Sequence, residues 1–184
     1  MKNLFAAAIL VTVLAGLSFA QTSSRAAAGR NDRSARIRIA VVEFTPGPNA
    51  AAMTAEAKRQ LQASIAFSIT QSKAFDVVDV RNTRAASQSD LAAINGTSTA
   101  AAVRVGKQMG VSYVLTGMVA EYNTAGSATL KARLVEVATG KVKYAGETLQ
   151  QATSAMRSTG AAEMQTKVMK PAIERLTEAL ISVF

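Results

Sequence analysis

Hydrophobic and polar residues alternate from Arg36 and then become continuously apolar from Ile39 to Val42, with Glu43 and Phe44 following. This pattern predicts a strand that begins exposed and ends buried. The stretch TPGPN follows at Thr45–Asn49, and its two prolines have no N–H group to donate to a neighbouring strand. We therefore expect the strand to end before these prolines.

An apolar residue recurs at every fourth position from about Ala51 to Ser72, which predicts an amphipathic helix. Its predicted inner stripe consists of Ala57, Leu61, Ile65 and Ile69, with Phe67 flanking them. Its other faces carry polar residues, namely Lys58, Arg59 and Gln62. A second strand is expected over Ala74–Val80, where alternation and continuity are mixed.

The pattern from Arg81 to Gly110 is helical again and divides at Gly96, a residue type that often follows a helix end. Serine and threonine at 97–99 are capping candidates for the second helix. The predicted inner face of that helix consists of Ala101, Val105 and Met109. We expect the helix to stop at Gly110.

Three further segments predict strands, at Val111–Asn123, Gly126–Gly140 and Lys141–Gln151. Their short connections predict an antiparallel meander. A final helix is expected from about Gly160 to Phe184, with a kink at Pro171 or a break there that opens a second helix. The predicted order is β-α-β-α-α-β-β-β-α, which indicates an α/β fold (an α+β sandwich) with a mixed sheet of about five strands and helices packed on it.

Residues 1–20 have the pattern of a secretory signal peptide, with Lys2 before an apolar run and small residues at Ser18 and Ala20. The run is short for a membrane span, so we expect cleavage after Ala20 and export to the periplasm. The chain has no Cys near that point, and we expect no lipid anchor. Residues 21–35 predict a basic disordered linker, and residues 36–184 predict the α/β domain.

Composition narrows the chemistry, because the chain contains no Cys, His or Trp. A thiolate nucleophile, a histidine base and a Cys/His zinc site are therefore excluded. The formal net charge is +9, and a basic arm near the start of the domain carries Arg25, Arg30, Arg33, Arg36 and Arg38. We expect this arm to be a solvated linker with at most peripheral contact to a membrane, and an acidic envelope polymer is an alternative. Export argues against nucleic acid as a partner.

The loop after the first strand is the first candidate site, and TPGPN has one glycine between two prolines. A phosphate-binding loop needs several glycines, so we expect no nucleotide there. Glu43 ends the first strand, where α/β sheets often bind ligands. We expect Glu43 to be a solvated strand end, and we expect the same of Glu121 and Tyr122.

Other residues offer weaker signals. Asp76 and Asp79 are three apart on a predicted strand, which turns them to opposite faces and prevents a carboxylate dyad. Ser72 and Lys73 are adjacent as in a Ser-Lys pair, but they follow a helix and predict a cap. Asn95 begins a chance-level glycosylation pattern, and no basic ribbon surrounds Tyr113, Tyr122 and Tyr144. We therefore expect no catalytic, cofactor-binding or metal-binding residue, and we expect that the protein is not an enzyme.

Four segments share an order and spacing that is fairly specific. They are RIAVVEFTP at 38–46, LQASIAFSITQSKAFDVVDV at 61–80, VGKQMGVSYVLTGMVAEYN at 105–123 and ARLVEVATGKVKYAGE at 132–147. Together they resemble the CsgG-type curli secretion and assembly family, which includes HfaB-like proteins. The LpoB-type activators of penicillin-binding proteins are the related alternative. This resemblance implies a non-enzymatic periplasmic α/β domain that docks on partners or forms oligomers.

Two departures from the CsgG and LpoB pattern shape the expectation. Those families usually begin with a lipidated Cys, whereas this chain contains no Cys. A CsgG channel also inserts β-hairpins into the membrane, but the predicted meander already uses residues 111–151, where such hairpins would have to lie. We therefore expect a compact envelope protein that acts by docking or oligomerisation. Three alternatives remain: an activator of a peptidoglycan synthase, an outer-membrane pore subunit, and a hydrolase that uses a carboxylate such as Glu43.

Overall fold

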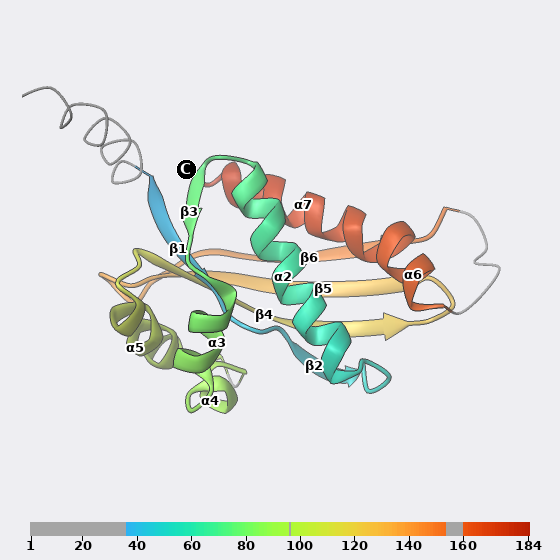
Figure 1. Ribbon diagram of the computed structural model, residues 1–184, viewed down its shortest axis with the longest axis horizontal. Helices are drawn as coiled ribbons and strands as arrows, with labels where there is room; N and C mark the ends of the chain where they lie inside the picture. The colour runs from blue at the N-terminus through green and yellow to red at the C-terminus, as the bar shows by residue number, and fades with distance from the viewer. Residues whose placement is uncertain (1–35, 96, 154–159) are drawn as a thin grey trace, which may run out of the picture. The chain divides into compact units, whose positions relative to one another are not determined.

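The computed structural model describes residues 36–95, 97–153 and 160–184 (Figure 1), so the predicted signal peptide and linker lie outside the described residues. The described strands form one mixed sheet in the order β3-β1-β4-β5-β6, and β2 pairs with β4. Their bounds are β1 Ile37–Val41, β2 Thr45–Asn49, β3 Phe75–Val77, β4 Tyr113–Asn123, β5 Ser127–Glu136 and β6 Val142–Gln151. The predicted fold class is confirmed.

The sheet is parallel on one side and antiparallel on the other. β1 pairs in parallel with β3 and β4, and β2 also runs parallel to β4. The strands β4, β5 and β6 follow one another as an antiparallel meander, as predicted. The long meander strands therefore form the half of the sheet that is farthest from β3.

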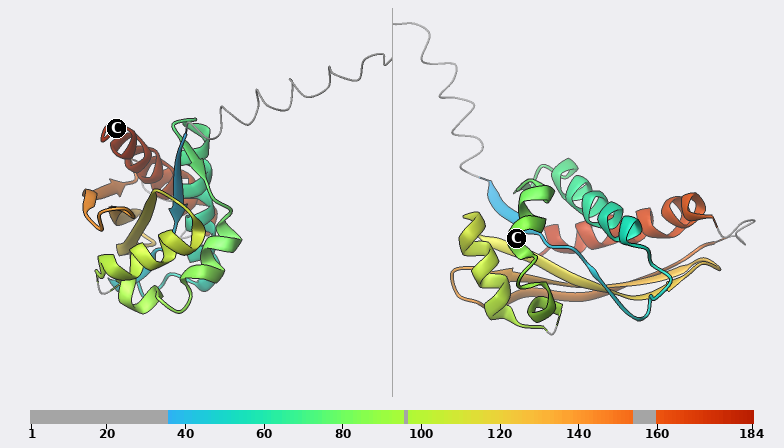
Figure 2. Two further views of the ribbon diagram at one scale, coloured as in Figure 1. Left: turned by 90° about the vertical axis from the view of Figure 1, so that its left-hand side faces the viewer. Right: turned by 60° about the horizontal axis from the view of Figure 1, so that its bottom comes forward.

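Helices cover both faces of the sheet (Figure 2). On one face lie α2 (Ala55–Gln71) and the C-terminal segment, which includes α6 (Ala161–Met164) and α7 (Lys170–Ile181). On the other face lie α4 (Leu91–Asn95) and α5 (Thr99–Met109), with α3 (Val80–Ser87) beside α5. The first core is built around Ile65, Leu115 and Leu134, and the second around Val105, Val114 and Val135.

The helix α5 ends as the sequence predicts. The Ser98 hydroxyl accepts a hydrogen bond from the Ala101 N–H group at 3.3 Å, and Gly110 adopts a left-handed conformation with φ of 61° at the other end. These are common capping arrangements, because they satisfy backbone groups that the helix leaves unpaired. Ala101 and Val105 are buried and Met109 is half-buried, so α5 does turn its predicted face to the sheet.

The first strand does end before the prolines, at Val41, but the proline segment expected to break the sheet is itself a strand, because Thr45–Asn49 forms β2. β2 pairs with β4 alone among the described strands, and its register shifts between Pro46 and Asn49. A proline N atom on the free side of an edge strand removes no ladder hydrogen bond, and an irregular register relaxes the requirement further.

Two other boundaries differ from prediction. The second strand ends at Val77 rather than Val80, because Asp79 caps α3 by accepting hydrogen bonds from the N–H groups of Arg81 and Asn82. The region from 81 to 110 contains α3, α4 and α5 rather than two helices.

The C-terminal helix is interrupted where proline predicts it. A π-helical turn at Gln165–Met169 separates α6 from α7, and Pro171 lies in the first turn of α7. The Lys170 N–H group donates to the Gln165 carbonyl oxygen, five residues earlier, so the helix departs from the α-helical pattern just before the proline. No helix in the described residues is long and apolar enough to cross a lipid bilayer.

Candidate functional site

The meander strands turn alternate side chains to opposite faces of the sheet. One face packs on α2 and α7, whereas the other begins beneath α4 and α5 and continues beyond them. We call this continuation the outer face and define it by Met118 on β4, Lys131 and Arg133 on β5, and Ala145 and Glu147 on β6. Lys131, Ala145 and Glu147 are exposed, so the outer face is open to solvent.

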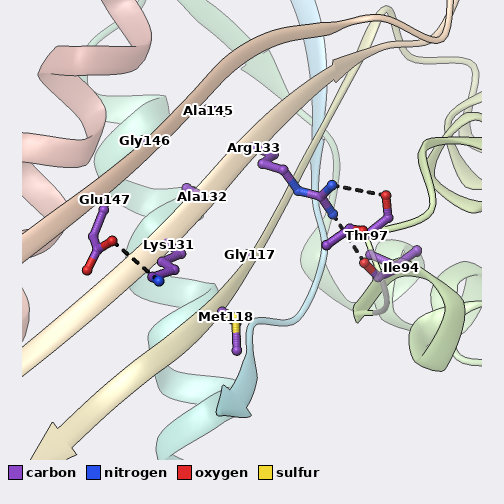
Figure 3. Close-up of a pocket in the computed structure, with 10 residues that line it drawn as sticks. All are labelled: Ile94, Thr97, Gly117, Met118, Lys131, Ala132, Arg133, Ala145, Gly146 and Glu147. Carbon is purple, nitrogen blue, oxygen red and sulfur yellow. Dashed lines mark hydrogen bonds and ion pairs between the residues drawn. The ribbon is translucent and has the colours of Figure 1, made fainter.

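A shallow hollow of about 360 Å³ lies on the outer face (Figure 3). The strand residues form its floor, and Ile94 and Thr97, at the end of α4 and just beyond it, border it. Met118 and Ala145 give it an apolar part, while Lys131 and Glu147 add opposite charges. The hollow therefore suits a protein surface or an extended peptide with both apolar and polar groups better than a small buried ligand.

Arg133 joins the outer face to the helices. Its Nη1 donates a hydrogen bond to the Thr97 carbonyl oxygen at 3.0 Å, and its Nη2 donates to the Ile94 carbonyl oxygen at 3.4 Å. Carbonyl groups at a helix end have no partner within the helix, so a guanidinium with several donors satisfies them well. Arg133 thus holds the end of α4 against β5 and fixes the rim of the hollow.

Lys131 and Glu147 form a pair across neighbouring strands. They are direct register partners, and Lys131 Nζ lies 3.4 Å from Glu147 Oε2 (Figure 3). Both side chains are about half exposed, at 51% and 53%, so the pair contributes little to stability. These two charges are consequently available to a partner at small cost to the fold.

Two glycines near the hollow are closely surrounded by other atoms. A Cβ atom at Gly117 would overlap the Phe44 ring and lie 2.5 Å from the Lys131 carbonyl oxygen. A Cβ atom at Gly146 would overlap the hydroxyl of Tyr144, two residues earlier on β6. Gly117 therefore needs glycine for packing, whereas a side chain at Gly146 would require the Tyr144 ring to move.

Glu43 does not lie in solvent as expected. Its side chain is 15% exposed, and its Oε2 lies 3.5 Å from Arg84 Nε on α3. Arg84 Nη2 donates a hydrogen bond to Gln62 Oε1, and Gln62 Nε2 donates to the Val41 carbonyl oxygen, both at 2.8 Å. These residues form a connected polar network at the carboxyl end of β1, which gives Glu43 a structural role.

The aspartates of the predicted second strand are also engaged in structure. Asp76 Oδ2 lies 3.5 Å from Arg38 Nε on the neighbouring strand β1, and Asp79 caps α3. They form no dyad, although the reason differs from the predicted one, because Asp79 lies outside the strand. Within the described residues no three acidic side chains gather into a possible metal site.

Ser72 follows α2 as a cap, as predicted, and its hydroxyl donates to the Ile69 carbonyl oxygen at 2.6 Å. Lys73 has a φ of 59°, which places it in the turn after the helix. Glu121 accepts a hydrogen bond from the Ser127 hydroxyl at 2.9 Å and is half-buried rather than solvated. Asn95 ends α4, and Gly96, the middle residue of the glycosylation pattern, lies outside the described residues.

The three tyrosines pack against the first core and form no exposed platform. Burial raises the pKa of Tyr122 and of Tyr144 above the ordinary value. Burial, followed by the charge of Glu136 and a hydrogen bond to it, raises the pKa of Tyr113. Tyr113 also contacts the terminal Phe184 ring edge-on, with the ring centres 5.0 Å apart.

The basic arm lies mostly outside the described residues, which exclude Arg25, Arg30 and Arg33. Arg36 is exposed at the start of the fold. Arg38 differs from the expectation, because it belongs to β1, pairs with Asp76 and donates a hydrogen bond to the Gly110 carbonyl oxygen at 3.0 Å. Arg38 is therefore part of the fold and not of a free arm.

Two side chains of α2 are placed opposite to prediction. Phe67 is 65% exposed rather than flanking the core, and Gln62 is fully buried in the Glu43 network. Phe67 borders a second hollow of about 640 Å³ between α2 and the C-terminal helix, which Ala63, Ser64 and Lys170 also line.

No family model and no curated protein matches this sequence. Among solved structures, PelC from Paraburkholderia phytofirmans, a dodecamer, has a TM-score of 0.51 and 16% identity, covering 77% of this chain and 89% of that chain. The lipoprotein GNA1162 from Neisseria meningitidis has a TM-score of 0.52 and 20% identity, covering 78% and 98%. LpoB from E. coli has a TM-score of 0.46 and 15% identity, covering 82% and 85%. At such identities, the likeness to PelC and GNA1162 establishes a shared fold and nothing finer.

Proposed function

We propose that this chain is a non-enzymatic protein of the bacterial cell envelope that acts by docking on other proteins or by oligomerisation, in a CsgG-type assembly or secretion role. One observation carries the proposal: the outer face, where three long strands present Met118, Ala145 and the Lys131–Glu147 pair to solvent. Mixed apolar and charged surfaces of this kind are typical of interfaces between proteins that also exist separately.

The roles of the polar residues support the non-enzymatic part of the proposal. Glu43 is bound to Arg84, Asp76 to Arg38, and Asp79 to the start of α3. Each of these carboxylates is held at a junction between elements by the partner named. A turnover activity of the purified chain that disappears in Glu43→Gln would contradict the proposal.

The comparisons support the envelope and assembly parts at the level of the fold. GNA1162 is a lipoprotein and PelC forms a dodecamer, so this fold serves in proteins of both kinds. The resemblance of the segments at 38–46, 61–80, 105–123 and 132–147 to the CsgG-type family supports the assembly role.

A photoreactive residue in place of Lys131, with the chain expressed in its own cells, tests the proposal. Because Lys131 is exposed at the centre of the outer face, we expect irradiation to cross-link the chain to a specific envelope protein. The matched control carries the same residue at Lys107, which is exposed on α5 away from the outer face, and should give far less product.

The identity of the captured protein separates the alternatives. Fibre subunits or outer-membrane secretion proteins would support the CsgG-type role, and a penicillin-binding protein would support the LpoB-like role instead. Conductance of the purified chain in planar bilayers would support a pore subunit and contradict our proposal. Equal capture at Lys131 and Lys107, or none at either, would also contradict it.

A further inference from the structure

The strand β6 forms one edge of the sheet and pairs with β5 alone among the described strands. Its backbone orientation follows from one hydrogen bond, in which the Ala152 N–H group donates to the Gly126 carbonyl oxygen at 2.7 Å. In an antiparallel pair, successive residues turn both backbone groups toward the partner strand and then away from it. Residues 148 and 150 therefore face β5, and residues 145, 147, 149 and 151 face away from the sheet.

Part of this edge is already satisfied by side chains. Arg175 Nη1 donates to the Leu149 carbonyl oxygen at 3.3 Å, and Gln150 Nε2 donates to the Gln151 carbonyl oxygen at 2.9 Å. The N–H and carbonyl groups of Ala145 and Glu147 have no such partner in the described part of the chain, and both residues are exposed. The open stretch of the edge is thus centred on Gly146.

The other edges of the sheet are poorly suited to accept a strand. β3 has three residues, and β2 contains Pro46 and Pro48, which have no N–H group to donate. β6 has ten residues and no proline. A long strand edge with free backbone groups is a template for another strand, and proteins usually protect such edges unless they use them.

We infer that β6 pairs antiparallel with β6 of a second copy, about a two-fold axis at Gly146. This register places Ala145 of each copy opposite Glu147 of the other. The two residues then exchange both of their backbone hydrogen bonds, as directly opposed residues do. The four free groups of each copy are all paired in this way. The arrangement is self-complementary, as a two-fold interface must be.

Side chains near the axis fit this register. Gly146 faces its own symmetry mate as a non-hydrogen-bonded pair with Cα atoms about 4.5 Å apart, and it brings no side chain to the axis. Each Glu147 lies beside a small alanine, and its charge remains paired with Lys131 of its own copy. The exposed Leu149 would gain contact with the second copy's β6.

This inference rests on the proposed function and deepens it, because it names a second copy as the partner and β6 as the site. It is tested with the purified chain, which has no cysteine of its own. Two variants are prepared, Ala145→Cys and Glu147→Cys, and are oxidised mildly, alone and as a mixture. Opposed residues have Cα atoms about 5.5 Å apart, within the range of a disulfide.

We expect cross-linked dimers in the mixture and none in either variant alone. Identical residues of the two copies lie roughly 8–9 Å apart in this register, at 3.4 Å rise per residue, and cannot be bridged. Cross-linking of one variant alone would place the axis elsewhere and overturn the inference. Absence of any cross-link, with a monomer by sedimentation at high concentration, would also overturn it.

A second pair of variants avoids cysteine. Glu147→Pro removes the outward N–H group and should make the chain monomeric, while its helical and strand content stays unchanged because no bond to β5 is lost. Glu147→Gln keeps the N–H group and should sediment as the parent chain does. Capture of another protein at Lys131 in cells does not depend on this pairing, so failure of the dimer and failure of the proposed function give different results.

Discussion

Gly117 shows how closely one residue can be specified by its surroundings. It lies on β4 over the Phe44 ring, and the Lys131 carbonyl oxygen of β5 occupies the space on the other side of a hypothetical Cβ atom. Phe44 is fully buried and among the largest side chains of the core. The Thr-Gly pair of the sequence pattern at 116–117 therefore has a packing reason.

Replacement of Gly117 by Ala should destabilise the fold by about 1–3 kcal/mol, the usual cost of overpacking a core. Urea unfolding followed by circular dichroism measures this loss. The same substitution in a Phe44→Leu background should cost less, because the shorter side chain relieves one of the two overlaps. A Gly117→Ala variant as stable as the parent chain would contradict this account.

At the residue scale, sequence reasoning located candidate residues better than it assigned their roles. Glu43 was identified at a strand end, but its partner Arg84 is 41 positions away and belongs to another element. The partner of Asp76 is Arg38 on a neighbouring strand. Such pairs depend on which strands lie side by side, and local patterns contain no information about that.

Among the elements, α2 illustrates what periodicity predicts and where it misleads. The structure gives Ala55–Gln71 within the predicted 51–72, and Leu61, Ile65 and Ile69 are buried as expected. Phe67 lies two positions from both Ile65 and Ile69, which at 3.6 residues per turn is the opposite side of the helix. Gln62 lies next to Leu61 and three positions before Ile65, so geometry places it at the core despite its polarity.

This arrangement makes a matched pair of substitutions informative. Ile65→Ala should cost about 2–5 kcal/mol, because it empties a site that is fully buried. Phe67→Ala should stay within about 0.5 kcal/mol of the parent chain, because that ring is 65% exposed. Urea midpoints measured side by side check both values. Similar losses of stability for the two variants would contradict this account, because they would mean that the Phe67 ring is buried against other residues in solution.

The meander was the element group most readily predicted, because strong alternation and short connections leave few arrangements. The strand at Thr45–Asn49 was missed because proline is a reliable breaker only where both sides of a strand are paired. The split of residues 80–109 into three helices was missed because α3 and α4 are short.

In the whole molecule, one polar network ties three layers together. Gln62 is fully buried on α2, contacts β1 through the Val41 carbonyl oxygen, and contacts α3 through Arg84, which in turn pairs with Glu43. Buried hydrogen-bonding groups are costly to leave unpaired. The network therefore favours one relative placement of these elements over alternatives that apolar contacts alone would tolerate.

Gln62→Met keeps the shape of this side chain and removes its hydrogen bonds. We expect a loss of about 1–3 kcal/mol in the free energy of unfolding, because the Val41 carbonyl oxygen and Arg84 both lose a partner. Gln60→Met, at an exposed position of the same helix, is the control and should change stability by less than about 0.5 kcal/mol. Equal stability of the two variants would show that the network contributes little.

The outer face was beyond sequence reasoning, although its strands were predicted. Its existence depends on where α4 and α5 stop over the sheet, and that position is fixed by Arg133 holding the end of α4. Side-chain alternation predicts two faces for each strand but does not predict which stretch of a face stays uncovered.

The short β3 and the prolines of β2 limit how this sheet can grow. Pairing between strand edges of different molecules produces fibrils when each copy has two edges that can pair, because a further copy can then always be added. Among the described strands, β6 alone has an edge suited to such pairing. An assembly built through β6 therefore closes at two members, and it leaves no second edge for open-ended polymerisation among the described strands.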